Sequence, residues 1–169
     1  MYRAYLAISA DGNIADRDGG VGWIKRFDGL ELGFTDFLGA MRGIVMGRTT
    51  YDQVLTFGKW PYAGKDVVVV TTHALEDPPE GVRAYSGAIA DLPESLPTEG
   101  DVWVLGGGML VSAMLAEGLI DRLELFVMPV ILGGGVPLIT GEAGDLTLDL
   151  VSHQAHDLGV MELVYAPRR

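Results

Sequence analysis

Cysteine is absent from this sequence, and histidine occurs only three times. The first absence excludes disulfides, thiolate metal ligands and a cysteine nucleophile, so any redox chemistry must come from a bound cofactor. His73 is expected in a turn, and His153 and His156 lack the even spacing that places two side chains on one strand face. No group of His, Asp and Glu has the spacing of metal ligands. The sequence therefore predicts no metal site and argues against a metal hydrolase.

Positive charge is also scarce. The chain has 12 Lys and Arg against 23 Asp and Glu, which gives a formal net charge of -11 at pH 7. Because nucleic acids and anionic membranes attract clustered cations, this charge disfavours both as partners. An acidic protein that binds a phosphorylated ligand must place its few cations carefully, which draws attention to Arg48.

Long hydrophobic runs are missing as well. No stretch approaches the roughly 20 apolar residues that a membrane-spanning helix requires. The N-terminal residues run into Asp11 and Gly12 before the apolar core of a signal peptide could form. We therefore expect a soluble, cytoplasmic protein with no membrane partner.

The hydrophobic residues that are present, 49% of 169, suffice for one sizeable core, so a single domain over 1–169 is expected. The apolar runs are continuous and not alternating, which is typical of parallel strands covered on both faces. They are 4–8, 43–46, 67–70, 102–105 and 123–130, and helix-compatible stretches occur at 32–41, 49–55, 89–96 and 107–116. Segments 146–156 and 160–166 flank a turn and predict an antiparallel hairpin. The pattern predicts an α/β fold with a central, mostly parallel sheet and a C-terminal antiparallel hairpin.

The strongest local signal is a glycine triplet, Gly106, Gly107 and Gly108, between an apolar strand and a helix. Glycines let the backbone approach a pyrophosphate closely, and the free N–H groups of a helix start point toward it. The alternative is a tight strand-to-helix turn that binds nothing, since the full GxGxxG fingerprint is absent.

A second signal surrounds Arg48. The apolar strand ends at Gly47 and a helix is expected to begin near Thr49, so Arg48, Thr49 and Thr50 lie where ligands of open α/β sheets bind. A phosphate fits this setting. In the plainer interpretation Thr49 caps the helix and Arg48 is a solvated surface charge.

Two further segments are rich in glycine. Segment 11–23 follows the first strand and either closes over a ligand, excluding water, or forms a long surface turn. Segment 127–138 combines Pro129, Pro137 and a second glycine triplet. A structural bend or a subunit contact is favoured there over a second phosphate site, because no clear helix follows.

Taken in order, these segments resemble the dihydrofolate reductase superfamily, and more closely its branch related to the C-terminal reductase domain of bacterial riboflavin biosynthesis. The motifs are SADGNIA at 9–15, MGRTTY at 46–51, LGGG at 105–108 and PVILGGGVPL at 129–138. The resemblance implies a three-layer sandwich around an eight-stranded sheet, with NADPH bound across the strand ends. The cofactor-binding residues that it implies are Ala7, Ile14, Gly47, Arg48, Thr49, Thr50, Thr71, Thr72, Leu105, Gly106, Gly107, Gly108, Met109 and Leu110.

The resemblance places the acid on the helix after the first glycine-rich loop, where Asp28, Glu31 and Asp36 compete. Asp28 and Asp36 are the catalytic candidates, and an apolar setting among Phe34, Phe37 and Leu38 is expected to suit Asp36 for proton transfer. The substrate stays open. Lys59 and Lys65 are the only cations between Arg48 and Val70, so no arginine follows the second helix to bind a folate tail.

The leading hypothesis is an NADPH-dependent reductase that transfers hydride to a small heterocyclic acceptor, pterin- or pyrimidine-like, or to a carbonyl-type acceptor. The resemblance places it with dihydrofolate reductase or 5-amino-6-(5-phosphoribosylamino)uracil reductase. The alternative is a non-catalytic nucleotide-binding or assembly protein that has kept the cofactor site. A homodimer is expected, with segment 123–138 burying a strand edge.

Overall fold

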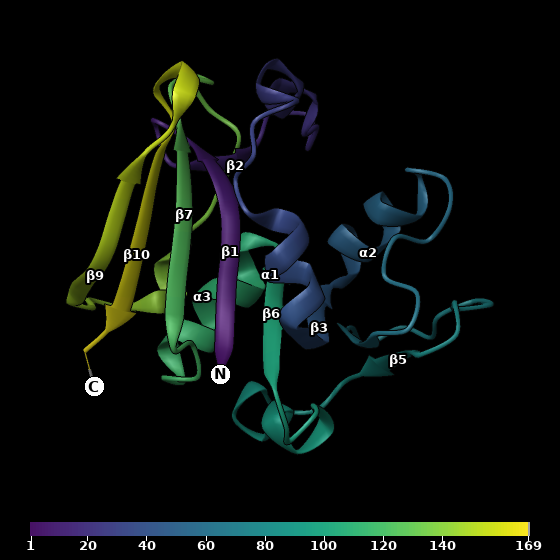
Figure 1. The fold of residues 1–169 in the computed structure, drawn as a ribbon. Coiled ribbons are helices and arrows are strands. Elements are labelled where there is room, and N and C mark those ends of the chain that lie inside the picture. Colours follow the sequence, from purple (N-terminus) through teal and green to yellow (C-terminus); the bar gives the residue numbers. More distant parts are fainter. Residues whose placement is uncertain (169) are drawn as a thin grey trace.

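A central sheet organises the computed structural model, which describes residues 1–168 (Figure 1). The order of its eight strands is β5-β4-β3-β6-β1-β7-β10-β9. The strands are β1 (Tyr2–Ser9), β3 (Met41–Gly47), β4 (Asp66–Val70), β5 (Val82–Tyr85), β6 (Asp101–Gly106), β7 (Arg122–Met128), β9 (Leu148–Ala155) and β10 (Met161–Pro167), with a separate pair β2 (Asn13–Ala15) and β8 (Val136–Pro137). The α-helices are α1 (Phe34–Ala40), α2 (Arg48–Leu55) and α3 (Gly108–Ala116), and the 3-10 helices are η1 (Gly22–Phe27), η2 (Ile89–Ser95), η3 (Gly141–Ala143) and η4 (Asp157–Gly159).

The strand directions confirm the predicted fold. Strands β5, β4, β3, β6, β1 and β7 run parallel to one another, whereas β10 is antiparallel to both β7 and β9. The continuous apolar runs are the strands that both layers of helices cover. The hairpin of β9 and β10 completes one side of the sheet.

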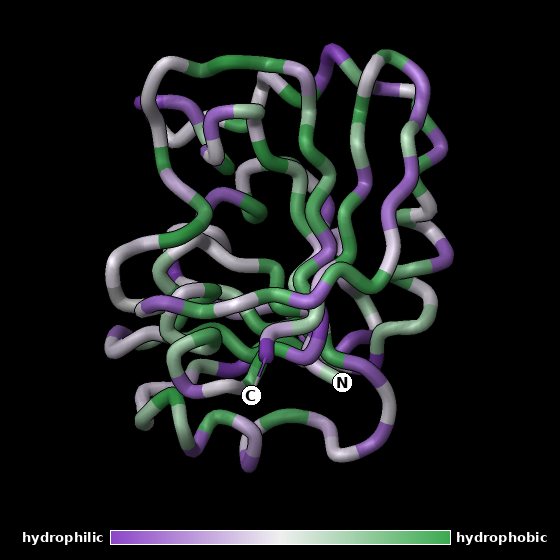
Figure 2. The backbone as a smooth tube through the Cα atoms, turned by 90° about the vertical axis from the view of Figure 1, so that its left-hand side faces the viewer, coloured by the Kyte–Doolittle hydropathy of each residue, from purple (hydrophilic) through white to green (hydrophobic). Residues whose placement is uncertain are grey.

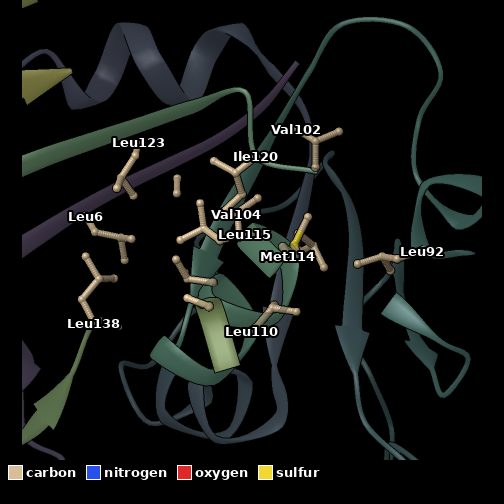
Figure 3. Packing of buried hydrophobic residues seen from close by; sticks show 14 of the residues in the cluster. Leu6, Leu92, Val102, Val104, Leu110, Met114, Leu115, Ile120, Leu123 and Leu138 are labelled. Atoms are coloured by element: carbon tan, nitrogen blue, oxygen red, sulfur yellow. The ribbon is translucent and has the colours of Figure 1, made fainter. Parts of the chain in front are cut away.

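Helices cover both faces of this sheet. Ile44 and Met46 pack with Tyr51 and Val54 of α2 and Phe37 of α1, whereas alternate residues of the same strands face α3. On the α3 face, Leu110, Met114 and Leu115 gather with Leu6, Val104 and Leu123 (Figure 3). Burying each of these side chains contributes about 1.5–3 kcal/mol. The result is the three-layer arrangement of helix, sheet and helix.

The strand order reverses between the neighbouring parallel strands β3 and β6, because the strands that follow them are added on opposite sides. After β3 it passes through α2 to β4 on one side, and after β6 it passes through α3 to β7 on the other, beyond β1. Because parallel crossovers are right-handed, these opposite directions place α2 and α3 on opposite faces. A crevice at the carboxyl ends of the strands is expected at such a reversal, and ligands of open α/β sheets bind there.

Helix bounds differ from the prediction in two places. The segment 89–96 forms the 3-10 helix η2, which contains Pro93, and proline removes a backbone donor that an α-helix needs. The helix predicted at 32–41 is the shorter α1, because Gly33 adopts a left-handed φ of 77° and Met41 is already extended. None of the helices described is both long and apolar enough to traverse a bilayer.

The hairpin side of the sheet corrects the expected dimer edge. Strand β7 pairs with β1 on one side and with β10 on the other, so the apolar strand at the start of segment 123–138 offers no free edge. The outermost strand is β9, which is largely exposed and carries Leu150 and Val151. Seen from this side, hydrophilic and hydrophobic residues are interspersed along the chain (Figure 2).

Candidate active site

Two helix N-termini lie close together at the carboxyl ends of β3 and β6, where the strand order reverses. Helix α2 begins directly after Gly47 and α3 directly after Gly107, and neither start receives a hydrogen bond from a capping side chain. The first N–H groups of a helix have no partner inside it and carry a partial positive charge. Both starts line one hollow with a volume of about 470 Å³. This hollow, called the cofactor hollow below, is suited to an anionic group.

Glycines at 106–108 let the backbone line the hollow closely. Gly106 has a φ of 106°, which disfavours a side chain, and the Gly106–Gly107 peptide is cis. A Cβ atom on Gly108 would run into the carbonyl oxygen of Pro137 and lie 2.8 Å from that of Leu138. A Cβ on Gly107 would lie 3.6 Å from Thr50 Oγ1. A larger residue is therefore strained at Gly106 and displaces segment 137–138 at Gly108, whereas at Gly107 its Cβ would lie at ordinary contact distance.

Arg48 is held at the edge of the cofactor hollow. Its Nε donates to the Asp52 carboxylate at 2.8 Å, and its Nη1 donates to the carbonyl oxygen of Ala74 at 3.2 Å. An exposed ion pair of this kind contributes only about 0.3–0.5 kcal/mol of stability. Its effect is to orient the guanidinium, whose five N–H groups exceed what these two acceptors use.

The bond to Ala74 also brings the turn after β4 beside Arg48. Thr71 is buried, and its Oγ1 accepts a hydrogen bond from the backbone N–H of His73 at 3.1 Å. Thr72 is exposed. Both threonines lie in the turn next to Arg48 and outside the lining of the hollow.

Most of the cofactor-binding residues expected from the sequence come together. Those that line the cofactor hollow are Ile14, Gly47, Arg48, Thr49, Thr50, Gly107, Gly108, Met109 and Leu110. Ala7 and Leu105 line a second, adjoining hollow, and Gly106 connects β6 to the start of α3. Sequence reasoning missed Gln53, Val136, Pro137 and Thr140, which also line the cofactor hollow. Only the Pro and Gly pattern of segment 127–138 gave a signal for two of them, and it was interpreted as a bend.

The second hollow has a volume of about 300 Å³ and an aromatic lining. It is called the acceptor hollow below. Tyr5, Phe34, Phe57, Tyr62 and Trp103 contribute the rings. Edge-on contacts join Trp103 to its neighbours, with ring centroids 5.5 Å from Phe34 and 5.8 Å from Tyr62. The residues that line both hollows, and so mark their junction, are Ile14, Ala15, Thr50, Gln53 and Gly107.

The polar atoms of these rings are fixed or neutral. Trp103 Nε1 donates to the carbonyl oxygen of Tyr5 at 3.1 Å, and the Tyr5 hydroxyl donates to that of Leu32 at 2.8 Å. Burial raises the pKa of Tyr62 to about 12 and also raises the pKa of Tyr5. Both phenols therefore stay protonated at neutral pH.

The glycine-rich segment after β1 forms a wall shared by both hollows. Strand β2 pairs with β8, and Asp11 accepts hydrogen bonds from Ser9 Oγ at 2.7 Å and from the N–H groups of Leu132 and Gly133. These bonds, the one from Ser9 foremost, hold the pKa of Asp11 well below its usual range. Gln53 Nε2 in turn donates to the carbonyl oxygen of Gly19 at 2.9 Å. The segment is therefore tied to α2 and to segment 132–137 at several points.

The three candidate acids lie away from both hollows. Asp28 follows η1, Glu31 lies in the connection to α1, and Asp36 is in the first turn of α1. All three are exposed, and none belongs to the lining of either hollow. The apolar setting expected for Asp36 is wrong, because α1 buries Phe37 against the sheet and leaves Asp36 in solvent.

A known family matches most of the chain. The family model described as the RibD C-terminal domain matches residues 3–161. The uncharacterized protein YwjB of Bacillus subtilis (strain 168) is 33% identical over 143 residues, covering 79% of each chain. YyaP of the same organism, also uncharacterized, is 27% identical over 95% of this chain and 91% of its own. The dihydrofolate reductase of Mycobacterium leprae (strain TN) is 30% identical over 56% of this chain and 53% of its own.

Solved structures give the same picture. A putative riboflavin biosynthesis protein from Shewanella sp. PV-4 superimposes with a TM-score of 0.84 at 30% identity, covering 99% of both chains. A diaminohydroxyphosphoribosylaminopyrimidine deaminase/5-amino-6-(5-phosphoribosylamino)uracil reductase from Thermotoga maritima has a TM-score of 0.74 at 18% identity. The match spans 99% of this chain and 56% of that longer one. At that identity the likeness establishes the fold alone.

Proposed function

We propose, from the premise that the chain belongs to the RibD C-terminal domain family, that it is an NADPH-dependent reductase. Its acceptor would be a small heterocycle, pterin- or pyrimidine-like, or a carbonyl-type molecule, and residues 1–169 would act as one domain. One observation carries the proposal. Two uncapped helix starts, a glycine turn and an oriented arginine line a single hollow that adjoins a second one.

The residues of the cofactor hollow fit a phosphorylated dinucleotide. Arg48, with Thr49 and Thr50, would bind the 2′-phosphate through charge-assisted hydrogen bonds, and Thr71 and Thr72 would lie beside it. The N–H groups at the starts of α2 and α3 would bind the pyrophosphate. Gly108 lets α3 begin directly against segment 137–138, because a Cβ atom at Gly108 would collide with the carbonyl oxygen of Pro137.

The junction of the two hollows is where the reacting ring and the acceptor would meet. When bound, the reduced nicotinamide supplies the hydride. Ile14, Ala15 and Gly107 would orient the ring and exclude water, because they line both hollows. Asp28 or Asp36 would deliver the proton through water, since neither carboxylate lines a hollow.

The test is a side-by-side titration with NADPH and NADH, followed by tryptophan fluorescence, on the wild type and on Arg48→Ala. Charge-assisted hydrogen bonds contribute about 1.5–3 kcal/mol, so Arg48→Ala should weaken NADPH binding by roughly 10- to 100-fold and leave NADH nearly unchanged. Arg83→Ala is the matched control, because this exposed arginine pairs with Asp66 outside the hollow. Equal affinity for the two cofactors in the wild type would overturn the 2′-phosphate assignment.

The rival function is a non-catalytic nucleotide-binding or assembly protein. The observation that favours it is the exposure of Asp28 and Asp36 outside both hollows. Turnover of NADPH with pterin, pyrimidine and quinone acceptors separates the two functions. Tight NADPH binding with no oxidation across the whole panel would favour the rival.

A homodimer belongs to the same proposal. The exposed apolar residues Leu150 and Val151 on the edge strand β9 support it, because such edges are usually covered. A monomeric mass in sedimentation equilibrium at micromolar concentration would contradict it. The proposed location is the cytoplasm, where the reductase would draw on NADPH.

A further inference from the structure

Among the residues that the structure describes, none with a side chain charged at neutral pH lines the acceptor hollow. Its lining consists of apolar and aromatic residues together with Ala7, Ala15 and Gly107. The polar side-chain groups are the hydroxyls of Tyr5, Thr50 and Tyr62, the amide of Gln53 and the indole N–H of Trp103, which already donates to the carbonyl oxygen of Tyr5. No Asp, Glu, Lys, Arg or His belongs to the lining among the described residues. A charged group buried inside the hollow would lose its hydration and gain no counter-ion from the lining.

The cationic side chains near the acceptor hollow do not belong to its lining. Lys59 follows Phe57 by two residues, and Lys25 and Arg26 follow Ile24, but all three are exposed and lie outside the lining. Arg48 lines only the cofactor hollow and already binds Asp52. An anionic substituent on the acceptor would therefore lack a partner in the acceptor hollow.

Two aromatic rings at the edge of the hollow remain accessible to solvent. Phe34, the first residue of α1, is 42% exposed, and Phe57, just after α2, is 62% exposed. Trp103, whose ring contacts Phe34 edge-on, is only 4% exposed. Exposed aromatic rings beside a buried one favour the binding of a flat ring, which gains contact area and stacking geometry.

We infer that the acceptor hollow selects a flat aromatic or heteroaromatic acceptor that is uncharged, and that it rejects acceptors bearing a phosphate or carboxylate beside the ring. This selection rests on the proposed function, in which the second hollow binds the molecule that accepts the hydride. It adds the charge and the shape of that molecule. The amide of Gln53 and the hydroxyl of Thr50, both at the junction, supply neutral polar partners for ring N–H and carbonyl groups.

The test compares two probes that differ in one carboxylate. Lumazine is a flat, uncharged pteridine-dione, and 6-carboxylumazine is its anionic counterpart. Their binding is measured by isothermal titration calorimetry, with the protein alone and with saturating NADP⁺. Lumazine should bind at least tenfold more tightly in both cases. Equal or tighter binding of 6-carboxylumazine would overturn the inference, as would failure of both probes to bind.

Variants at the exposed rings locate the site. Phe57→Ala and Phe34→Ala should each weaken lumazine binding severalfold, whereas Leu55→Ala should not. Leu55 is the matched control, because it is an apolar residue of α2, 43% exposed, that lies outside the lining. Phe57→Lys should raise the affinity for 6-carboxylumazine and narrow the preference for lumazine. An unchanged preference in Phe57→Lys would overturn the placement of the ring beside Phe57.

NADPH binding separates this inference from the proposed function. All four variants should bind NADPH like the wild type, since none of the changed residues lines the cofactor hollow. If lumazine binds as expected and NADPH does not, the proposed function fails while the charge selection stands. If NADPH binds and the preference between the probes is absent, only the selection fails.

Discussion

The cofactor hollow and the acceptor hollow adjoin, yet they are built from different parts of the chain. The cofactor hollow depends on backbone, namely the starts of α2 and α3 and the glycine turn between β6 and α3. The acceptor hollow depends on aromatic side chains that project from β1, α1, β6 and the segment after α2. One is formed mainly by backbone groups, and the other mainly by side chains carried on the same framework.

This difference predicts how each hollow responds to mutation. A backbone site tolerates few changes, because displacing a helix start moves several N–H groups together. A side-chain site can change its ligand through one exposed residue while the fold persists. Three substitutions test this contrast, in decreasing order of expected effect.

Gly108→Ala should distort the cofactor hollow and have the largest effect on NADPH binding. The new Cβ would collide with the Pro137 carbonyl oxygen and lie 2.8 Å from that of Leu138, so the start of α3 or strand β8 must shift. Overpacking of this kind costs about 1–3 kcal/mol of folding stability. NADPH affinity should fall by more than about tenfold, as measured by fluorescence titration, while lumazine affinity changes far less. Gly39→Ala is the control, because a Cβ there meets nothing within 4 Å, and equal losses in both variants would contradict the prediction.

Asp11→Asn should weaken both hollows together. The carboxylate holds Leu132 and Gly133 and thereby the wall that carries Ile14 and Ala15. Removing its charge should lower the affinities for NADPH and for lumazine by a similar factor, about three- to fivefold. Selective loss of one ligand would show that the wall serves one hollow only.

The pH dependence of stability gives an independent readout for the same residue. Hydrogen bonds lower the folded-state pKa of Asp11, so its contribution is complete above the unfolded pKa of about 3.9 and is lost as the pH falls through the lower folded value. The melting temperature of the wild type should exceed that of Asp11→Asn at neutral pH. The difference should shrink below about pH 4, and a difference that persists unchanged in acid would contradict the assignment.

Asp52→Asn should have the smallest effect of the three substitutions and should change only the affinity for NADPH. Asp52 engages Nε of Arg48 and adds negative charge near the proposed 2′-phosphate site. Its neutralisation should improve NADPH affinity by about two- to threefold, in keeping with the small energy of exposed pairs. NADH and lumazine affinities should stay the same, and weaker NADPH binding would show that orienting Arg48 matters more than removing the charge.

The cofactor hollow could be predicted from sequence because its signals are local. An apolar run, glycines and a helix follow one another within residues 101–116, and the same order surrounds Arg48 at 41–55. The strand, turn and helix therefore identify the position of the site before any long-range contact is known. The parallel strands and the C-terminal hairpin could also be predicted from sequence, since each follows from the pattern of its own segment.

The acceptor hollow could not be predicted in this way. Tyr5, Phe34, Phe57 and Trp103 are far apart in sequence and meet only because β6 lies between β1 and β3. The free strand edge was misplaced for the same reason, because nothing in the sequence of β7 shows that β10 covers it. The setting of Asp36 depended on the rotation of a helix of two turns, in which the adjacent Phe37 took the buried position.

The position of β1 has a consequence for biosynthesis. Strand β1 is synthesised before both of its neighbours, β6 and β7, and it lies at the centre of the sheet, where Tyr2 pairs with Val102 and Arg3 with Arg122. Its partners are therefore synthesised long after it, and pairings of such sequence separation form slowly. A nascent chain that ends before β7 leaves one edge of an apolar strand unpaired. Such a chain is prone to aggregation or chaperone binding until β7 emerges.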